Sequence, residues 1–285
     1  MLILDGKAVS QAQREALKPR IANFVAKAGR KPKLVVVLVG THLPSQVYVR
    51  NKVKACESVG MDSTVLHWPE DLSIEKFREQ LHALEKDPGV DGVLVQLPLP
   101  PQLKNVDLGS DVDAAKDADG FAYGNLGMMI AGKIRVAPCT PMGVMTILKH
   151  YKIEVAGRRA VVVGRSLIVG KPMALLLLDA NATVTVAHSK TKDLEAVTRE
   201  ADIVVVAAGQ REFLGRSAFK EGAVVIDVGM HGTGEGGKLC GDVRFEELKG
   251  WASAATPVPG GVGPMTITTL LENTMKLAEI RQGLT

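Results

Sequence analysis

The sequence predicts an α/β protein of two lobes, and three observations support this. Short runs of branched apolar residues, typical of strands buried on both faces, recur along the 285-residue chain. Most of these runs are followed by a segment with helical spacing of apolar residues, and such alternation is typical of parallel sheets. The length is also near the limit for one core, so we expect two lobes, joined by two helices, with a cleft between them.

The first half of the chain contains three predicted strands. A helical pattern covers residues 8–28, where Pro19 should kink or break the helix. The following elements alternate in type, in the order strand 33–40, helix with Ser45 as N-cap and Gly60 as C-cap, strand 63–68, helix 73–87 and strand 92–97.

A stretch rich in small and turn-forming residues, 117–129, marks the best boundary between the lobes. A helix with Thr140 as N-cap and Pro141 at its first position should follow to about residue 151 and bridge the halves. The second half repeats the alternation, with strands at 158–164, 182–187, 202–209 and 222–229, helices at 171–180 and 191–200, and a last helix from near Pro264.

The composition restricts the class of function. Hydrophobic residues make up 46% and charged residues 23%, which is typical of a soluble globular protein. The net charge of +4 suits an anionic small ligand, but the basic residues are scattered, so we expect no nucleic-acid partner. Three cysteines without a CxxC pair predict reduced thiols in a cytoplasmic protein. We expect no signal peptide, membrane span or metal site, because no basic apolar leader, long apolar run or HxxxH pair occurs.

The segment AVVVGRSLIVGKPMALLL (160–177) reads as strand, glycine turn and helix, the context in which a helix N-terminus binds phosphate. It departs from the G-x-G-x-x-G fingerprint, because its turn carries Gly164, Ser166, Val169 and Gly170. On this motif alone, a plain α/β connection explains the turn equally well. The series of four strands in this half favours a Rossmann-type NAD(P)-binding lobe.

The end of the next predicted strand indicates which dinucleotide binds. NAD-binding folds usually place an acid about 20 residues beyond the glycine turn, to accept from the ribose hydroxyls. This chain has His188, Ser189 and Lys190 there, and Arg165 in the turn. Such donors suit a 2′-phosphate, so we predict NADP rather than NAD, although solvation alone would explain Lys190.

Residues of the first lobe converge on the carboxyl edge of its predicted sheet, where α/β proteins bind ligands. Tyr48 and Lys52 lie one helical turn apart, and Gln96 ends another strand at the same edge. Asp119 lies in the turn-rich linker. The glycines of TPVPGGVGPMT (256–266) would let backbone approach a ligand in the cleft. An exposed Tyr-x-x-x-Lys and a Pro/Gly connection each have ordinary explanations. The prediction therefore rests on the convergence of these residues rather than on any one of them.

Seven sequence blocks, in order, resemble the bifunctional methylenetetrahydrofolate dehydrogenase/methenyltetrahydrofolate cyclohydrolase (FolD) family over essentially the whole chain. They are VGTHLPSQVYVRNK (39–52), VQLPLP (95–100), KDADGF (116–121), PCTPMG (138–143), GRSLIVGKP (164–172), HSKT (188–191) and TPVPGGVGPMT (256–266). The chain departs from the usual pattern at Pro44, Ala115, Ala118 and Ala122, where the family usually has Ala, Pro and Val and often His, respectively. These changes could adjust the substrate edge of the cleft.

The resemblance implies NADP-dependent oxidation of 5,10-methylenetetrahydrofolate and hydrolysis of the methenyl product to 10-formyltetrahydrofolate. It also implies a homodimer and tetrahydrofolate substrates with or without a polyglutamate tail. The folate-binding catalytic domain would comprise residues 1–118 and a C-terminal helix over 266–285, and the NADP-binding domain 119–265. Two alternatives remain, a shikimate-type dehydrogenase of two lobes and a non-catalytic nucleotide-binding protein.

The resemblance also assigns residues to roles. Lys52 would be the acid/base of the hydrolysis, its pKa lowered from about 10.4 by burial and by the substrate cation. Gln96 would fix the amine. Tyr48, the third member of the catalytic set, would offer a ring face to the substrate and a hydroxyl near the lysine. The substrate-binding set implied is Asp119, Tyr48, Ser45, Pro259, Gly260 and Gly261. The cofactor-binding set implied is Gly164, Arg165, Ser166, Val169, Gly170, His188, Ser189 and Thr140.

Overall fold

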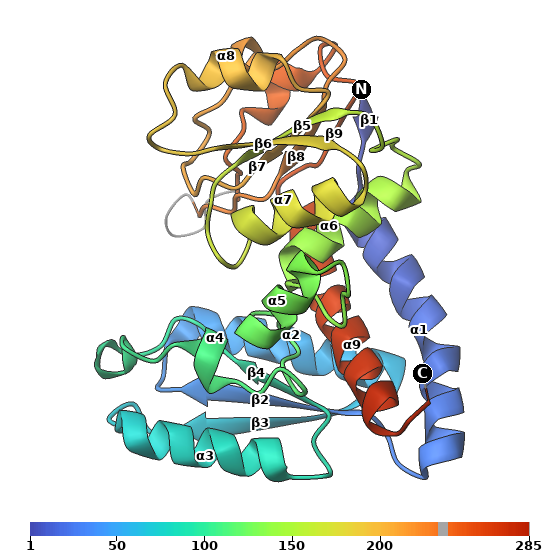
Figure 1. Ribbon diagram of the computed structural model, residues 1–285, viewed down its shortest axis with the longest axis vertical. Coiled ribbons are helices and arrows are strands. Elements are labelled where there is room, and N and C mark those ends of the chain that lie inside the picture. The colour runs from blue at the N-terminus through green and yellow to red at the C-terminus, as the bar shows by residue number, and fades with distance from the viewer. Residues whose placement is uncertain (233–238, 285) are drawn as a thin grey trace. The chain divides into compact units, whose positions relative to one another are not determined.

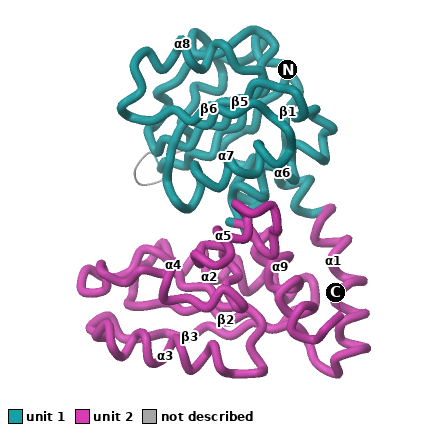
Figure 2. Tube along the Cα trace, viewed as in Figure 1, with its two compact units in different colours: residues 1–11, 138–266 teal, residues 12–137, 267–285 magenta. Residues whose placement is uncertain are grey.

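The computed structural model describes residues 1–232 and 239–284, which divide into two compact units (Figures 1 and 2). Unit 1 comprises residues 1–11 and 138–266, and unit 2 comprises 12–137 and 267–285. The helices α1 (Gly6–Ala28) and α9 (Val262–Arg281) each contribute to both units. The predicted mixed α/β class with parallel sheets and two domains is confirmed.

The boundary between the two compact units differs from the domain boundary expected from the sequence. The predicted boundary at 118/119 stays a prediction for the folate and NADP domains, whereas the compact units change at 137/138. The helix expected to bridge the halves, α6 (Cys139–His150), lies wholly within unit 1. The C-terminal helix predicted over 266–285 starts earlier, at Val262, and ends at Arg281, while residue 285 lies outside the described residues.

Unit 2 is built on a three-stranded parallel sheet in the order β3-β2-β4. The central strand β2 (Lys33–Val39) pairs with β3 (Asp62–Trp68) and β4 (Gly92–Val95). Its last six residues are buried, as the continuous apolar run predicts. The other elements of this unit are helical: α2 (Leu43–Val59), α3 (Ile74–Lys86), η1 (Pro101–Leu103), α4 (Leu108–Asp111) and α5 (Tyr123–Ile130).

Unit 1 is built on a six-stranded parallel sheet in the order β1-β9-β8-β7-β5-β6. Its strands are β1 (Leu2–Ile3), β5 (Arg159–Val163), β6 (Thr183–Ala187), β7 (Ile203–Val206), β8 (Val224–Asp227) and β9 (Ala254–Ala255). From β5 the chain winds outward to β6 on one side, and from β7 to β8 and β9 on the other. The topological switch point, where doubly wound sheets bind ligands, therefore lies between β5 and β7. The remaining helices of this unit are α7 (Gly170–Asp179), α8 (Leu194–Arg199), η2 (Arg216–Ala218) and η3 (Phe245–Leu248).

Two local expectations about helix starts are wrong, and one of the two outcomes expected at Pro19, a break, does not occur. The helix α2 begins at Leu43 and places Ser45 inside its first turn, so Ser45 is not the N-cap. Likewise α6 begins at Cys139 after Pro138, and Thr140 lies within it. Pro19 does not break α1, which continues to Ala28. Leu17, Ile21 and Phe24 of α1 are buried, and this packing offsets the hydrogen bond that the proline removes.

The predicted end of α2 is confirmed. Gly60 ends α2 with a φ of 84°, a conformation that glycine adopts without strain. Ser73, expected as the first residue of a helix over 73–87, is instead the N-cap of α3 and accepts from the backbone N–H of Lys76 at 3.3 Å. Among the described residues, no helix combines the length and the apolar character needed to cross a bilayer.

Candidate active site

Lys52 and Gln96 meet at the carboxyl edge of the unit 2 sheet. Gln96 directly follows β4, and Lys52 lies on α2, the helix that follows β2. The Nζ atom of Lys52 donates to Oε1 of Gln96 at 2.9 Å. The Nε2 atom of Gln96 donates to the carbonyl oxygen of Leu97 at 2.7 Å, which fixes the orientation of the amide. The backbone N–H of Gln96 donates to Val37 O at 2.9 Å and anchors the residue to the sheet.

Ser45 and Tyr48 occupy the N-terminal half of the same helix. The buried Oγ of Ser45 lies 2.8 Å from Nδ1 of His42 and donates to Leu97 O at 3.5 Å. The contact with Leu97 links the start of α2 to the segment after β4, whereas the contact with His42 is local to the start of the helix. Tyr48 lies one turn before Lys52, with 43% of its surface exposed. Its role toward a ligand stays a prediction.

The loop that carries Asp119 is held by a buried carboxylate that the sequence analysis missed. Asp117 accepts from the backbone N–H groups of Gly120 at 2.8 Å and Ala122 at 2.7 Å. It also accepts from Nδ2 of Asn125 at 3.0 Å. Burial raises the pKa of Asp117, an effect that these hydrogen bonds oppose. The signal was available in the sequence, because an Asp three residues before a Gly is a common turn former.

Asp119 itself is half-buried and lines a small recess beside β4. The rest of the lining is mainly apolar and consists of Val93, Val95, Leu108, Val112, Asp117 and Phe121. A carboxylate on an apolar wall can accept hydrogen bonds from a flat heterocycle that carries N–H donors. This recess and the Lys52–Gln96 pair belong to the same unit.

The glycine turn of unit 1 connects β5 to α7. A Cβ atom at Gly164 would lie 2.3 Å from Ala207 O, and one at Gly170 would lie 2.3 Å from Gly164 O. Gly164 also has a φ of 133°. The Oγ of Ser166 accepts from the N–H groups of Val169 at 3.2 Å and Gly170 at 3.3 Å, which orders the turn at the start of α7. The turn brings backbone close to any ligand at this helix N-terminus.

A second turn, after β6, carries His188 and Ser189. Thr191 organises it by accepting from the N–H of His188 at 2.8 Å, and its own N–H donates to His188 O at 2.8 Å. The N–H of Lys190 donates to Nδ1 of His188 at 3.1 Å, so the neutral ring carries its proton on Nε2. Ser189 is exposed, as is Arg165 in the neighbouring turn after β5. Thr191 lay in a recognised block, but its role depends on the closed geometry of the turn.

The other predicted residues of this unit surround the glycine-rich segment before α9. Gly260 O accepts from Lys7 N at 3.2 Å, and Gly261 N donates to Pro257 O at 2.8 Å. A Cβ at Gly6 would lie 1.7 Å from Gly261 O, so the segment packs tightly against the start of α1. Pro259 is exposed. The Oγ1 atom of Thr140 lies 3.1 Å from that of Thr266. The predicted location of these residues in a cleft stays a prediction.

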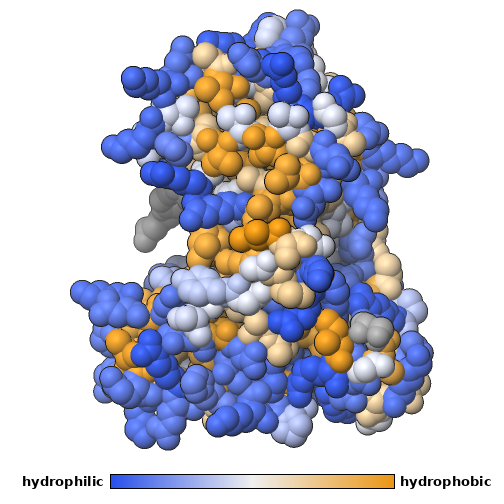
Figure 3. All heavy atoms as spheres, in the orientation of Figure 1, coloured by the Kyte–Doolittle hydropathy of each residue, from blue (hydrophilic) through white to orange (hydrophobic). Residues whose placement is uncertain are grey.

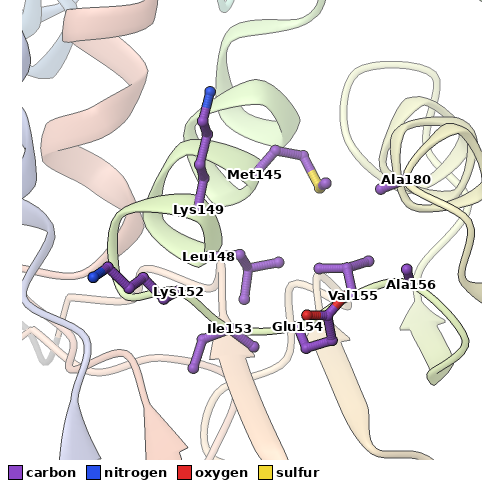
Figure 4. Close-up of a pocket in the computed structure, with 9 residues that line it drawn as sticks. All are labelled: Met145, Leu148, Lys149, Lys152, Ile153, Glu154, Val155, Ala156 and Ala180. Atoms are coloured by element: carbon purple, nitrogen blue, oxygen red, sulfur yellow. The ribbon is translucent and has the colours of Figure 1, made fainter.

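A cavity of about 400 Å³ lies at the opposite end of the unit 1 sheet (Figure 4). Part of its lining, 153–156, precedes β5, and Ala180 precedes β6, so it opens at the amino ends of these strands. In Figure 4 the ammonium ends of Lys149 and Lys152 point away from it. It contains none of the predicted site residues, and parallel α/β sheets bind ligands at the other edge.

Comparison with protein families gives a match for both parts of the chain. Residues 4–119 match the tetrahydrofolate dehydrogenase/cyclohydrolase catalytic domain, and residues 138–282 match the NAD(P)-binding domain of the same family. The chain belongs to the tetrahydrofolate dehydrogenase/cyclohydrolase family. The resemblance drawn from seven sequence blocks is therefore confirmed.

Individual members of this family agree over nearly the full length. The bifunctional protein FolD of Bdellovibrio bacteriovorus is 59% identical over 281 residues, covering 99% of this chain and 98% of the relative. The crystal structure of the FolD methylenetetrahydrofolate dehydrogenase/cyclohydrolase of Campylobacter jejuni is 46% identical, with a TM-score of 0.94 and 99% of each chain covered. The Trypanosoma brucei enzyme, solved with NADP cofactor and an inhibitor, is 36% identical with a TM-score of 0.92 and covers 98% of each chain.

Shikimate dehydrogenase resembles this chain in fold alone. The enzyme of Aquifex aeolicus is 14% identical with a TM-score of 0.52. The shikimate-type alternative therefore receives no support beyond the shared two-lobed architecture.

Proposed function

We propose that this chain oxidises 5,10-methylenetetrahydrofolate to the methenyl form with NADP and hydrolyses that product to 10-formyltetrahydrofolate. The observation that carries the proposal is the hydrogen bond from Lys52 to Gln96 at the carboxyl edge of the unit 2 sheet. Membership in a family of dehydrogenase/cyclohydrolases supplies the reaction class.

The dehydrogenation needs little acid/base chemistry from the protein. A hydride leaves the methylene carbon, and its two nitrogen neighbours stabilise the resulting cation. No proton leaves in that step, so the chain has only to orient its ligands. NADP, when bound, accepts the hydride.

Hydrolysis of the methenyl product requires proton transfer. Water adds to the cationic carbon and forms a C–O bond, and the bond from that carbon to N5 then breaks. One proton of the water passes to N5 and the other leaves to solvent. We assign the proton transfers to Lys52, whose Nζ is held by the oriented amide of Gln96.

We assign substrate binding to the residues around this pair. Asp119, on the loop fixed by Asp117, would accept from the ring N–H and amino groups of the pterin. Tyr48 would stack on the pterin or the aminobenzoyl ring. Ser45 would act indirectly, by holding the start of α2 to the segment after β4. Pro259, Gly260 and Gly261 would approach the ligand through backbone groups.

The glycine turn of unit 1 fits a dinucleotide. Gly164 and Gly170 leave no room for a Cβ, and the helix N-terminus at α7 suits a pyrophosphate. Exposed Arg165 and Ser189, with the Nε2–H of His188, provide donors for a 2′-phosphate and support NADP over NAD. Val169 would line the same turn, and Thr140 would contact the cofactor from α6.

We further propose a cytoplasmic homodimer that contacts its partner copy through β6 and α7. The strand β6 is at the edge of its sheet, so one side of its backbone lacks a strand partner in the described sheet. Figure 3 shows apolar side chains gathered over β6 and α7. Leu178 and Val186 of these elements are 57% and 41% exposed. Three free cysteines suit a reducing compartment, and the net charge of +4 suits folates with polyglutamate tails.

A spectrophotometric assay tests the proposal. Purified protein is given 5,10-methylenetetrahydrofolate with NADP or NAD, and separately 5,10-methenyltetrahydrofolate alone. We expect reduced cofactor with NADP and decay of the methenyl compound faster than in buffer. Reduction without accelerated decay would remove the cyclohydrolase assignment. Cofactor binding with neither reaction would favour the non-catalytic alternative.

A further inference from the structure

Two buried carboxylates lie beneath the loops that follow β7 and β8 in unit 1. Asp227 is the last residue of β8, and Asp242 follows the segment after that strand. Asp242 is 0% exposed and Asp227 4%. Neither residue belongs to the sequence blocks on which the site was predicted, and neither has a role in the proposed chemistry. Burial of such groups is costly unless hydrogen bonds satisfy them.

Asp242 accepts four hydrogen bonds, two at each oxygen. Its Oδ2 accepts from the N–H groups of Ala208 at 2.7 Å and Gly209 at 3.0 Å. Its Oδ1 accepts from the N–H of Gln210 at 3.0 Å and lies 2.7 Å from Nε2 of His231. Three consecutive backbone donors after β7 and one ring after β8 thus meet on a single carboxylate.

Asp227 extends this network along the β8 side. Its Oδ1 accepts from Gly229 N at 2.9 Å and from Asp242 N at 3.0 Å, and its Oδ2 accepts from Val243 N at 2.9 Å. Two glycines make room for the carboxylates. A Cβ at Gly229 would lie 2.3 Å from Oδ1 of Asp242, and one at Gly241 would lie 1.9 Å from Oδ2 of Asp227.

We propose that Asp242 is a positioning residue for the nicotinamide half of the dinucleotide, acting through the loop 208–210 and the His231 ring. The proposal rests on the proposed NADP site. Both loops follow the carboxyl ends of strands near the switch point, where the dinucleotide of a doubly wound fold lies, because β7 borders that point and β8 is the next strand. Such folds bind the two nucleotide halves on opposite sides of that point. His188 and Arg165 place the 2′-phosphate on the β5–β6 side, which leaves β7 and β8 for the nicotinamide.

The substitution Asp242→Asn tests the proposal without changing the size of the side chain. The amide has one acceptor oxygen, so two of the four donors lose their partner, and its NH₂ group then faces N–H groups. We expect hydrogen exchange of the amides of residues 208–210 to accelerate. We expect hydride transfer to slow by about 10- to 100-fold, because a small displacement of a reacting ring is costly.

A comparison of two ligands distinguishes a positioning role of Asp242 from general damage to unit 1. Asp242→Asn should weaken binding of NADP but leave binding of 2′-phospho-ADP-ribose, which lacks nicotinamide, within about twofold of wild type. His231→Ala should also weaken the binding of NADP, but to a smaller extent. The matched control is Asp71→Asn, the same chemical change at an exposed position between β3 and α3 of unit 2, which should change the binding of neither NADP nor 2′-phospho-ADP-ribose.

Different outcomes would contradict the role of Asp242 and the proposed function. Unchanged hydride transfer and unchanged exchange at 208–210 in Asp242→Asn would overturn the inference. Equal weakening of both ligands would also overturn it, because it would show general damage to the nucleotide site. Failure of the wild-type protein to bind NADP would instead contradict the proposed function, and exchange at residues 208–210 would still report whether Asp242 holds this loop.

Discussion

The ammonium group of Lys52 donates to Oε1 of Gln96 at 2.9 Å, and the amide that receives it is itself fixed by a bond to Leu97 O. The two residues lie 44 positions apart and meet because β2 and β4 are adjacent parallel strands. A neutral acceptor orients the amine without placing a negative charge beside it. A carboxylate in place of Gln96 would favour the charged amine and oppose its release of a proton.

Substitution of Gln96 by Glu should therefore impair hydrolysis more than dehydrogenation. The new carboxylate would stabilise the ammonium form of Lys52 by a charge-assisted hydrogen bond. We expect the rate of methenyltetrahydrofolate hydrolysis near pH 7 to fall by about 100-fold, the lower end of the range that one general acid/base typically contributes. The pH dependence of the rate measures the effect, which should be partly restored at higher pH. A proportional loss of both activities at every pH would contradict it.

Arg165→Ala should weaken NADP more than NAD. Arg165 is exposed in the turn after β5 and can pair with a 2′-phosphate, which NAD lacks. We expect the ratio of kcat/KM for NADP to that for NAD to fall by about 10-fold, the effect of roughly 1.4 kcal/mol. Lys171→Ala removes an exposed cation in the first turn of α7, beside the proposed pyrophosphate site, and serves as the comparison because it should affect NADP and NAD equally. An equal effect of Arg165→Ala on both cofactors would remove the 2′-phosphate assignment.

Gly170→Ala should disrupt the nucleotide turn. Its Cβ would lie 2.3 Å from Gly164 O and 2.6 Å from Arg165 N, and neither backbone atom can move without displacing β5 or α7. We expect NADP affinity to fall by more than about 10-fold, measured by titration calorimetry. The control is Gly127→Ala in α5, where the new Cβ meets nothing within 4 Å. That change should stabilise the protein by about 0.5–1 kcal/mol and leave NADP binding unchanged.

Much of this arrangement could be predicted from the sequence. Continuous apolar runs predicted β2, β5 and β7, because strands buried on both faces need no polar alternation. The two-residue strands β1 and β9 were not predicted, because two residues carry no periodic signal. The starts of α2 and α6 were misplaced for another reason. Pro44 and Pro141 allow an earlier start, so Ser45 and Thr140 lie within the first turns.

The residues of the candidate site could likewise be predicted only in part from the sequence. The candidates Lys52 and Gln96 were predicted because each follows a recognisable strand. Thr191 and Asp242 were missed as positioning residues, because most of their partners are backbone N–H groups, and every non-proline residue carries one. Only the folded geometry shows which carboxylate or hydroxyl accepts from which loop.

Asp91 should be a major source of stability in unit 2. It is 0% exposed and accepts from Nη1 and Nη2 of Arg30 at 2.6 and 2.7 Å, and Arg281 lies 3.4 Å away. Asp91→Ala leaves two partly buried guanidinium groups without their carboxylate. We expect a loss of about 3–5 kcal/mol in the free energy of unfolding, measured with urea. Asp62→Ala, which breaks the exposed pair with Lys31, should cost less than about 1 kcal/mol. Equal losses would contradict the buried-pair argument.

Asp227 should give stability a specific pH dependence. Burial raises its pKa to about 6, although backbone hydrogen bonds from Asp242 and Val243 act in the other direction. In the unfolded chain an aspartate titrates near 3.9, so between about pH 4 and 6 the folded state holds a proton that the unfolded state has released. The contribution of Asp227 to stability therefore falls as pH rises through this window, by at most about 3 kcal/mol.

The variant Asp227→Asn cannot titrate and isolates this effect. Urea unfolding at pH 4.5 and pH 7 should show wild type losing stability relative to the variant as pH rises. The difference between the two proteins removes the contribution of other groups, such as Asp117 and Glu272, whose pKa values are also raised by burial. A constant difference, or one that grows in favour of wild type, would contradict the assignment.

The measurement that tests the central claim most directly is the pair of activities of Lys52→Met. Methionine has about the length of lysine but no ammonium group, so it cannot transfer a proton. We expect hydrolysis of methenyltetrahydrofolate to fall to the rate in buffer, while NADP reduction with methylenetetrahydrofolate keeps a large part of its kcat. A folded variant that still binds folate but loses both activities in proportion, or that retains hydrolysis, would contradict the assignment of the hydrolytic step to Lys52.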